Sequence, residues 1–357
     1  MPGFDALLDQ HRPVRLLTAA LETGNYPYAY LFTGPEGVGK KVAAQAFAMA
    51  CNCQSGKRQE IHAASDETAD GQDSENTAFS CGQCRSCRKI LSESHPDVYW
   101  ILPSGNYIKV AQIRELCLRL SLKPHEAEMR LAVITEAHTL NAEAGNTLLK
   151  VLEEPPEQTL FILTARQASD LLPTILSRCR HIRFNPISRE SIRHYLEGHY
   201  AIDARDADII AAMAGGSLSS AAAMTEKGWI KQRNWIIETL TELDRQPVNY
   251  HLAFAESLAK DSSRVETALA IMKAWYRDLA VFAYLPDQLI NRDLHDEIAL
   301  RSKQMTTARL LEISRKIDAT ERSIQANANA RLAMDNLVIA LSNKDSSKNG
   351  KNYRHPV

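Results

Sequence analysis

The sequence predicts an α/β fold in its first half and an all-helical fold in its second half. Short apolar runs alternate with helical segments up to about residue 185, and a glycine-rich loop separates the first run from the next helix. This alternation is typical of a parallel sheet with helices on its faces. From residue 188 onward the pattern is helical throughout. With 357 residues, the chain is long enough for two or three domains.

The composition is that of a soluble globular protein. Apolar residues make up 45% of the chain and charged residues 24%, and no apolar run is long enough to cross a bilayer. The formal net charge of −1 argues against a surface built mainly to contact nucleic-acid phosphates. Residues 1–5 carry no basic and apolar targeting signal, so we expect a cytoplasmic protein without a membrane partner.

The first half contains five apolar runs that we interpret as strands. They lie at Tyr30–Phe32, Val98–Leu102, Leu131–Ile134, Leu160–Leu163 and Ile182–Phe184. Apolar residues at helical spacing predict helices between them. These helices are expected at Phe4–Glu22, Val42–Ala50, Val110–Leu120 and Asn141–Glu154. Residues 54–80 are polar with few apolar positions, which predicts a disordered or mobile insertion.

The second half is expected to contain helices joined at two glycine sites. The predicted helices are Ile192–Leu196, Ala207–Ala214, Ile230–Leu243, Val265–Phe282, Thr307–Ile317 and Ile324–Leu341. Joints at Gly215–Gly216 and Lys227–Gly228 divide the chain. We therefore expect an α/β domain over 1–186, a helical lid over 187–227, a helical domain over 228–342 and a disordered tail over 343–357.

The glycine-rich loop has the pattern of a phosphate-binding loop. It lies between a strand and a helix and reads Gly-Pro-Glu-Gly-Val-Gly-Lys-Lys. Its candidate binding residues are Gly34, Gly37, Gly39, Lys40 and Lys41. The glycines let backbone N–H groups surround phosphate oxygens, and Lys40 adds a positive charge. Lys41 stands where a Ser or Thr normally holds Mg²⁺. The loop is therefore predicted to hold phosphate but not to cleave it.

The residues after two later strands complete the candidate nucleotide site. Such sites place an acidic Mg²⁺-ordering residue and a catalytic Glu after a second strand. Here Thr135 occupies the first of these positions, and Glu136 is left where it would polarise a water. Thr164 ends the next strand and is either a polar sensor of the γ-phosphate or a structural threonine.

Three of the seven cysteines form two overlapping Cys-x-x-Cys units, Cys81, Cys84 and Cys87. In a cytosolic chain this pattern indicates metal before disulfides, and a fourth thiolate would complete a closed structural zinc site. Cys51 and Cys53 are both candidates for that ligand. The alternatives to a zinc module at about residues 51–90 are a redox dithiol and unligated thiols.

Several further motifs occur in a fixed order along the chain. They are Tyr28–Phe32 before the loop, the cysteine set, His95–Asp97, Ile113–Arg114, Asn146–Pro156 and Ser177–Cys179. Together they resemble the bacterial clamp-loader branch of the AAA+ ATPases, from about Phe4 to Gly216. A weaker resemblance to the family's collar domain continues at Trp275–Leu279 and Asn327–Asn329.

The resemblance implies roles for particular residues. In this family the arginine of Ser-Arg-Cys projects into a neighbouring subunit's ATP site, which assigns an arginine finger to Arg178. The family's first zinc ligand corresponds to Cys53. The second-sensor arginine is replaced by Ser219 and Ser220, which, with Lys41 and Thr135, implies that the chain's own hydrolysis is lost.

The resemblance therefore implies a non-motor subunit of the DNA polymerase III clamp loader. It would act beside the gamma or tau subunits and delta, with structural zinc, and would help to place the sliding β clamp on primed DNA. Binding of ATP or another nucleotide at its own loop is left open. One alternative is a hydrolysis-competent gamma/tau-like ATPase subunit. The other is a zinc-dependent nucleic-acid-binding protein on an AAA+ scaffold.

Overall fold

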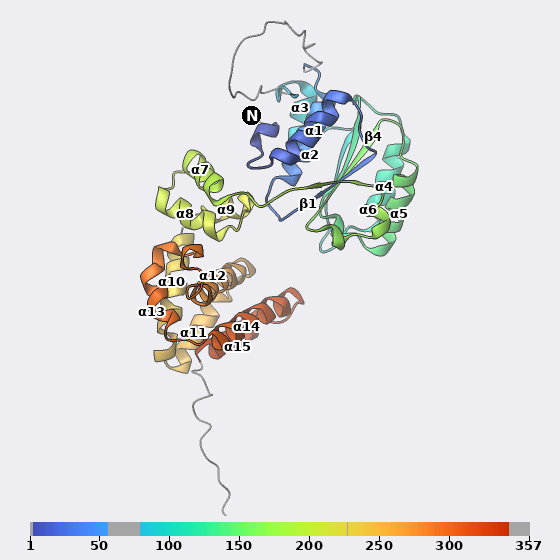
Figure 1. Cartoon of the computed structure of the whole chain (residues 1–357). Helices are drawn as coiled ribbons and strands as arrows, with labels where there is room; N and C mark the ends of the chain where they lie inside the picture. Colours follow the sequence, from blue (N-terminus) through green and yellow to red (C-terminus); the bar gives the residue numbers. More distant parts are fainter. Residues whose placement is uncertain (1–2, 56–78, 227, 343–357) are drawn as a thin grey trace, which may run out of the picture. The chain divides into compact units, whose positions relative to one another are not determined.

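The computed structural model describes residues 3–55, 79–226 and 228–342 (Figure 1). By their contacts the residues divide into two compact units. The first comprises Met1–Ile192 together with Gly215–Ser220, and the second comprises Arg193–Ala214 together with Ala221–Val357. The ends of these units fall inside the predicted lid, so the three-part division stays a prediction. The predicted tail, and most of the predicted insertion, lie outside the described residues.

The first unit is built on a five-stranded parallel sheet with the strand order β2-β3-β4-β1-β5. The strands are β1 (Ala29–Thr33), β2 (Val98–Ile101), β3 (Arg130–Ile134), β4 (Thr159–Ala165) and β5 (Arg180–Arg183). β1, β3 and β4 are buried along their whole length. Their nearly continuous apolar character follows from this burial on both faces.

Helices cover both faces of the sheet (Figure 1). They are α1 (His11–Thr23), α2 (Lys40–Asn52), α3 (Arg85–Leu91), α4 (Val110–Ser121), α5 (Ala142–Glu153) and α6 (Pro173–Leu176). Alternate strand residues face two separate cores. Tyr30 and Phe32 of β1 pack with Phe47 of α2, whereas Leu31 belongs to the core that contains Leu148 of α5. The predicted parallel α/β class is confirmed.

The second unit is all-helical in its described residues. Its main helices are α8 (Ala204–Met213), α10 (Trp229–Glu242), α11 (Val248–Leu258), α12 (Ser262–Val281), α13 (His295–Ser302), α14 (Thr307–Gln325) and α15 (Ala330–Ser342). Two further helices, α7 (Arg189–His199) and α9 (Leu218–Met224), run from one contact unit into the other. Trp275 and Met272 of α12 lie in one core with Ile313 of α14 and Val338 of α15. The predicted all-helical second half is confirmed.

Two strand predictions were partly wrong because both strands lie at sheet edges. In β2 only Val98 is buried, and the other residues are half-buried. β5 begins at Arg180, two residues before the predicted start, and only Ile182 of its residues is buried. An edge strand pairs on one side only, so polar side chains are tolerated there, and β5 therefore extends beyond its apolar run at Arg180 and His181.

Helix boundaries also differ where the backbone turns left-handed. The helix predicted at Phe4–Glu22 is a short 3-10 turn, η1 (Phe4–Ala6), followed by α1, with Asp9 at φ 57° between them. The last predicted helix was extended too far toward the N-terminus. Ile324 belongs to α14, and Asn327 has φ 65° before α15 begins. Asn tolerates this conformation better than most residues and ends helices in this way.

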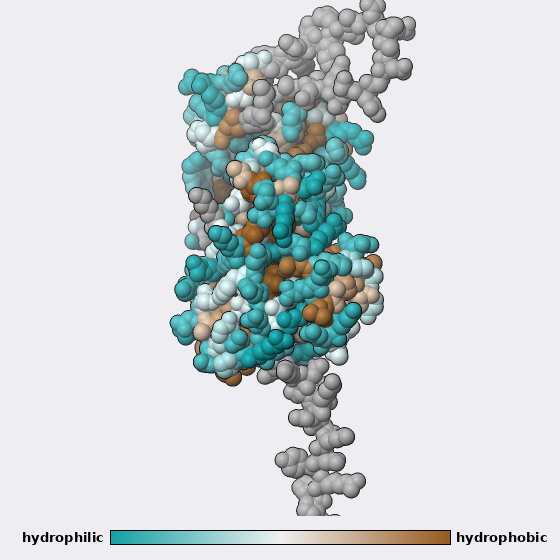
Figure 2. All heavy atoms as spheres, turned by 90° about the vertical axis from the view of Figure 1, so that its left-hand side faces the viewer, coloured by the Kyte–Doolittle hydropathy of each residue, from teal (hydrophilic) through white to brown (hydrophobic). Residues whose placement is uncertain are grey.

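The surface in Figure 2 is mostly hydrophilic, with small separate hydrophobic patches. Exposed large apolar side chains of the described residues include Leu118, Val248, Tyr284 and Leu332. None of the helices in the described ranges is both long enough and apolar enough to span a membrane.

Candidate functional site

The carboxyl ends of β1, β3 and β4 bring the candidate nucleotide residues together. In the sheet register Phe32 pairs with Thr164, and Ile134 pairs with Leu163. Thr135 and Thr164 therefore stand at the same level, next to the point where Gly34 leaves β1. Ligands of open parallel sheets bind at this carboxyl edge.

The loop between β1 and α2 depends on its three glycines. Gly34, Gly37 and Gly39 have φ values of 144°, 72° and 99°. A Cβ at Gly34 would lie 2.4 Å from the carbonyl oxygen of Phe184, and one at Gly37 would lie 2.2 Å from the Oγ atoms of Ser217 and Ser219. Positive φ and close approach both require glycine here.

The start of α9, together with Ser217 before it, packs directly on this loop. The Leu218 N–H donates to the carbonyl oxygen of Gly37 at 3.0 Å, and the Ser217 Oγ accepts from the Ser220 N–H at 3.2 Å. Ser219 and Ser220, which are predicted to replace the second-sensor arginine, thus lie in the first turn of α9, which contacts the loop. They offer hydroxyl groups where an arginine would offer a positive charge.

Lys40 is bonded to the loop itself. Its Nζ donates to the carbonyl oxygens of Gly34 and Pro35, each at 2.5 Å. Burial lowers the pKa of Lys40, and the neighbouring carboxylate of Glu36 opposes that shift. Glu36 in turn accepts from both Nε and Nη2 of Arg166, at 2.8 and 2.5 Å. A phosphate entering the loop would compete with these contacts.

Lys41 points its ammonium at an acidic side chain outside the loop. Its Nζ lies 2.6 Å from Glu93 Oε1 and 5.3 Å from the centre of the Trp100 ring. The side chain in the Mg²⁺-binding position is therefore an ion-pair and cation–π partner. An ammonium group cannot ligate a cation, so it supplies no replacement for the missing hydroxyl.

The residues after β3 are held by the neighbouring strands. Thr135 is buried, and its Oγ1 donates to the carbonyl oxygen of Ile101 at 3.2 Å. Glu136 is exposed with φ 51°, and its N–H donates to Thr164 Oγ1 at 3.1 Å. The Thr164 hydroxyl thus joins the ends of β3 and β4. This contact is structural, and the sensor role stays a prediction.

Arg178 lies near the amino ends of the strands, whereas the loop follows the carboxyl end of β1. β5 runs parallel to β1, and Arg180 pairs with Tyr30. Arg178 is therefore level with residue 28. Gly34 lies six residues further along β1, which is about 20 Å at roughly 3.3 Å per residue. The guanidinium donates to Glu153 Oε1 at 2.6 Å and to the Thr174 carbonyl oxygen at 2.9 Å. It is 35% exposed.

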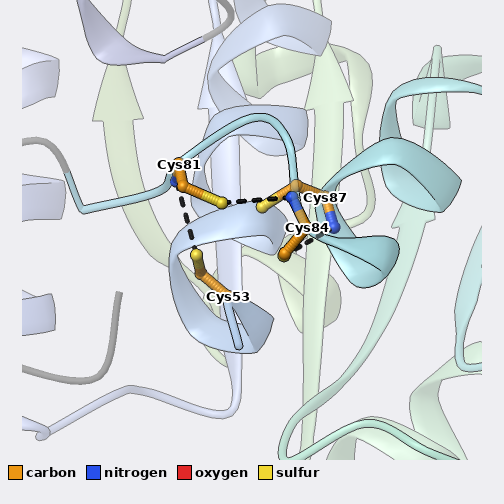
Figure 3. A group of neighbouring side chains, drawn as sticks. All are labelled: Cys53, Cys81, Cys84 and Cys87. Carbon is orange, nitrogen blue, oxygen red and sulfur yellow. Dashed lines mark hydrogen bonds between the residues drawn. The ribbon is translucent and has the colours of Figure 1, made fainter. Parts of the chain in front are cut away.

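Four of the cysteines converge in one cluster. The Sγ atoms of Cys53, Cys81, Cys84 and Cys87 all lie within 4.8 Å of one another (Figure 3). Cys53 follows α2, and the other three lie on the loop before α3 and in its first turns. Cys51, the other candidate for the first ligand, is outside this cluster.

The cluster fits a tetrahedral metal ion. Four sulfurs at the usual Zn–S distance of about 2.3 Å lie roughly 3.8 Å apart, which is within the 4.8 Å that bounds the observed spacing. N–H groups already point at the sulfurs: Cys81 donates to Cys53 Sγ at 3.3 Å, and Cys84 to Cys81 Sγ at 3.2 Å (Figure 3). Burial raises the pKa of Cys81, but the N–H groups of Cys84 and Gln83 outweigh it and hold the pKa at about 6. These four residues could hold zinc and would use it structurally.

The packing partners of the loop were not predicted. Glu93, Arg166 and Ser217 lie far from the loop in sequence, and no local pattern links them to it. The charge of Lys41 gave no such signal either, because the side chain is exposed and water could solvate its ammonium.

Two family profiles match the chain. One, described as "DNA polymerase III, delta subunit", covers residues 9–188, and the other, described as "DNA polymerase III, delta subunit, C terminal", covers residues 227–343. The chain belongs to the DNA polymerase III delta-subunit family. The predicted resemblance to the bacterial clamp-loader branch is confirmed, and within that branch the chain is similar to the delta′ subunit described next.

Two relatives and one solved structure illustrate the match. The delta′ subunit of Bacillus subtilis is 28% identical over 337 residues, which cover 93% of this chain and 96% of the relative. The tau subunit of Escherichia coli is 32% identical over 229 residues, 63% of this chain but only 32% of tau. A gamma subunit-related protein from Thermotoga maritima aligns with a TM-score of 0.48 at 17% identity, covering 94% of this chain and 99% of that one.

Proposed function

We propose that the chain is a non-motor subunit of the DNA polymerase III clamp loader. It assembles with gamma or tau and delta in the cytoplasm and helps to load the sliding β clamp onto primed DNA. Arg178 enters the ATP site of a neighbouring subunit, and the chain's own loop does not hydrolyse ATP. The match to delta′ over nearly the whole chain, and to tau over 63% of it, supports this assignment.

The position of Arg178 carries the proposal. An arginine side chain reaches only a few ångströms beyond its backbone, and the sheet separates Arg178 from the chain's own loop. The guanidinium is half-buried and accessible from outside. It can therefore meet a triphosphate bound to another chain, where fingers of this kind raise hydrolysis rates by about 10³- to 10⁵-fold.

The contacts of the loop support the loss of its own hydrolysis. Lys41 pairs with Glu93, and the Thr135 hydroxyl donates to Ile101. Mg²⁺ in such sites is held by a hydroxyl, a carboxylate and phosphate oxygens, and here neither protein ligand is present. Lys40 and the loop glycines still allow phosphate to bind without turnover.

The test is reconstitution of the clamp loader with this chain, with Arg178→Ala and without the chain. We expect the variant to assemble and to show a lower DNA-stimulated ATPase rate. An unchanged rate would contradict the proposal. Failure of the chain to co-purify with gamma or tau and delta would reject membership itself.

A gamma/tau-like ATPase is the second candidate, favoured by the 32% identity to tau and by the retained Lys40 and Glu136. It predicts turnover by the isolated chain that Glu136→Gln abolishes. The absence of turnover by the isolated chain in the presence of Mg²⁺ would remove this candidate.

A further inference from the structure

The guanidinium of Arg178 is held at two of its three nitrogens. Nη1 donates to the Thr174 carbonyl oxygen at 2.9 Å and to Ser177 Oγ at 3.3 Å. Nη2 donates to Glu153 Oε1 at 2.6 Å. Nε has no acceptor within the described ranges, so one edge of the fork stays available to a ligand from outside.

Glu153 comes from a different element than the arginine it binds. It is the last residue of α5, whereas Arg178 follows α6, and the two helices lie side by side (Figure 1). Without Glu153, the guanidinium's hydrogen bonds to the described residues would all be to its own preceding turn. The ion pair therefore fixes the side chain relative to the sheet and not only to a four-residue helix.

The position of Glu153 makes the pair more than an incidental contact. A carboxylate at a helix C-terminus is placed unfavourably against the helix dipole. A cation beside Glu153 relieves this effect, so Arg178 is drawn to the end of α5. The short, charge-assisted bond to Glu153 restricts rotation of the guanidinium. It therefore fixes the direction in which the Nε–H points.

We propose that Glu153 is a positioning residue for Arg178. It holds Nη2 while the open edge, which includes Nε, meets a phosphate oxygen of the neighbouring subunit's nucleotide. The arginine then keeps its internal contacts when it binds phosphate, and less side-chain freedom is lost at that step. This inference rests on the proposed action of Arg178 in trans.

The test uses the reconstituted clamp loader and its DNA-stimulated ATPase. We expect Glu153→Ala to lower kcat by about two- to fivefold, the range given by the loss of one exposed ion pair. The ATP concentration for half-saturation should stay unchanged, because the finger acts on the transition state. Glu153→Gln should lie between Ala and the native residue, since its carbonyl oxygen still accepts a hydrogen bond.

Glu154→Ala is the matched control. Its side chain is an exposed carboxylate at the same helix end, and among the described residues it pairs with no cation, so kcat should not change. In the Arg178→Ala background, Glu153→Ala should have no further effect.

The outcomes separate the two claims. A kcat for Glu153→Ala equal to or above the native value, or a further loss in the Arg178→Ala background, would overturn the positioning role while the finger stands. If Arg178→Ala itself left the ATPase unchanged, the proposed function would fail, and this inference with it.

Discussion

The carboxyl ends and the amino ends of the strands carry positively charged side chains with different contacts. At the carboxyl edge, Lys40 bonds to the carbonyl oxygens of its own loop, and Lys41 pairs with Glu93. At the opposite edge, Arg178 is tethered by Glu153 but keeps one side open. Both loop lysines are paired within the chain, whereas the Nε of Arg178 has no acceptor among the described residues. The proposed action of Arg178 in trans requires this difference.

Loss of zinc from the cysteine cluster would have the largest effect, and it should act on the face of the sheet that α2 covers and not on the α5 face beside Arg178. The cysteine cluster supports α3. The Gln45 side chain of α2 donates to the carbonyl oxygens of Ile90 and Leu91 at the end of α3, each at 3.1 Å. A structural zinc site contributes folding energy directly, on the order of 10 kcal/mol in small zinc domains. Cys87→Ser should therefore lower the zinc content below one ion per chain. It should also speed the hydrogen exchange of backbone amides in α2.

Cys51→Ser is the control for this variant, because Cys51 lies outside the cluster. It should keep the zinc. Equal zinc loss in both variants, or faster exchange around Arg178 than in α2 of Cys87→Ser, would contradict the account.

The next largest effect concerns the close packing around the loop glycine Gly37. Gly37 and Gly215 both have positive φ, at 72° and 58°. Around Gly215 no atom lies within 4 Å of an added Cβ, whereas at Gly37 the Cβ meets two serine hydroxyls. Gly215→Ala should cost about 1 kcal/mol of unfolding free energy from strain, and Gly37→Ala about 2–4 kcal/mol from strain plus overpacking. Urea unfolding measures both, and equal costs would argue against close packing of 217–220 on the loop.

The smallest effect concerns Lys41. Replacing it with Thr restores the hydroxyl of an active loop but leaves Thr135 without a carboxylate. The isolated chain should remain inactive, and the loss of the exposed Glu93 pair should cost less than about 1 kcal/mol. An ATPase assay with Mg²⁺ together with thermal unfolding checks both points. Turnover by Lys41→Thr would mean that this single position separates the chain from an active enzyme.

Local patterns predicted most of the fold and part of the sites. The apolar runs gave β1, β3 and β4 because central strands are buried on both faces, and cysteine spacing gave three of the four clustered thiols. The break between α14 and α15 was predicted too early in the chain, between Ile317 and Ile324, since the single left-handed residue that marks it, Asn327, leaves the helical pattern around it uninterrupted. The Lys41–Glu93 pair joins residues 52 positions apart, and only the folded chain brings them together.

One paired measurement tests the central claim most directly: the DNA-stimulated ATPase of clamp loaders reconstituted with Lys40→Ala or with Arg178→Ala. Lys40 belongs to the chain's own loop and Arg178 to the far edge of the sheet. The account predicts that Lys40→Ala leaves the rate unchanged, while Arg178→Ala removes hydrolysis at the neighbouring site, about 10³-fold or more for that site. A rate that falls with Lys40→Ala and survives Arg178→Ala would contradict it.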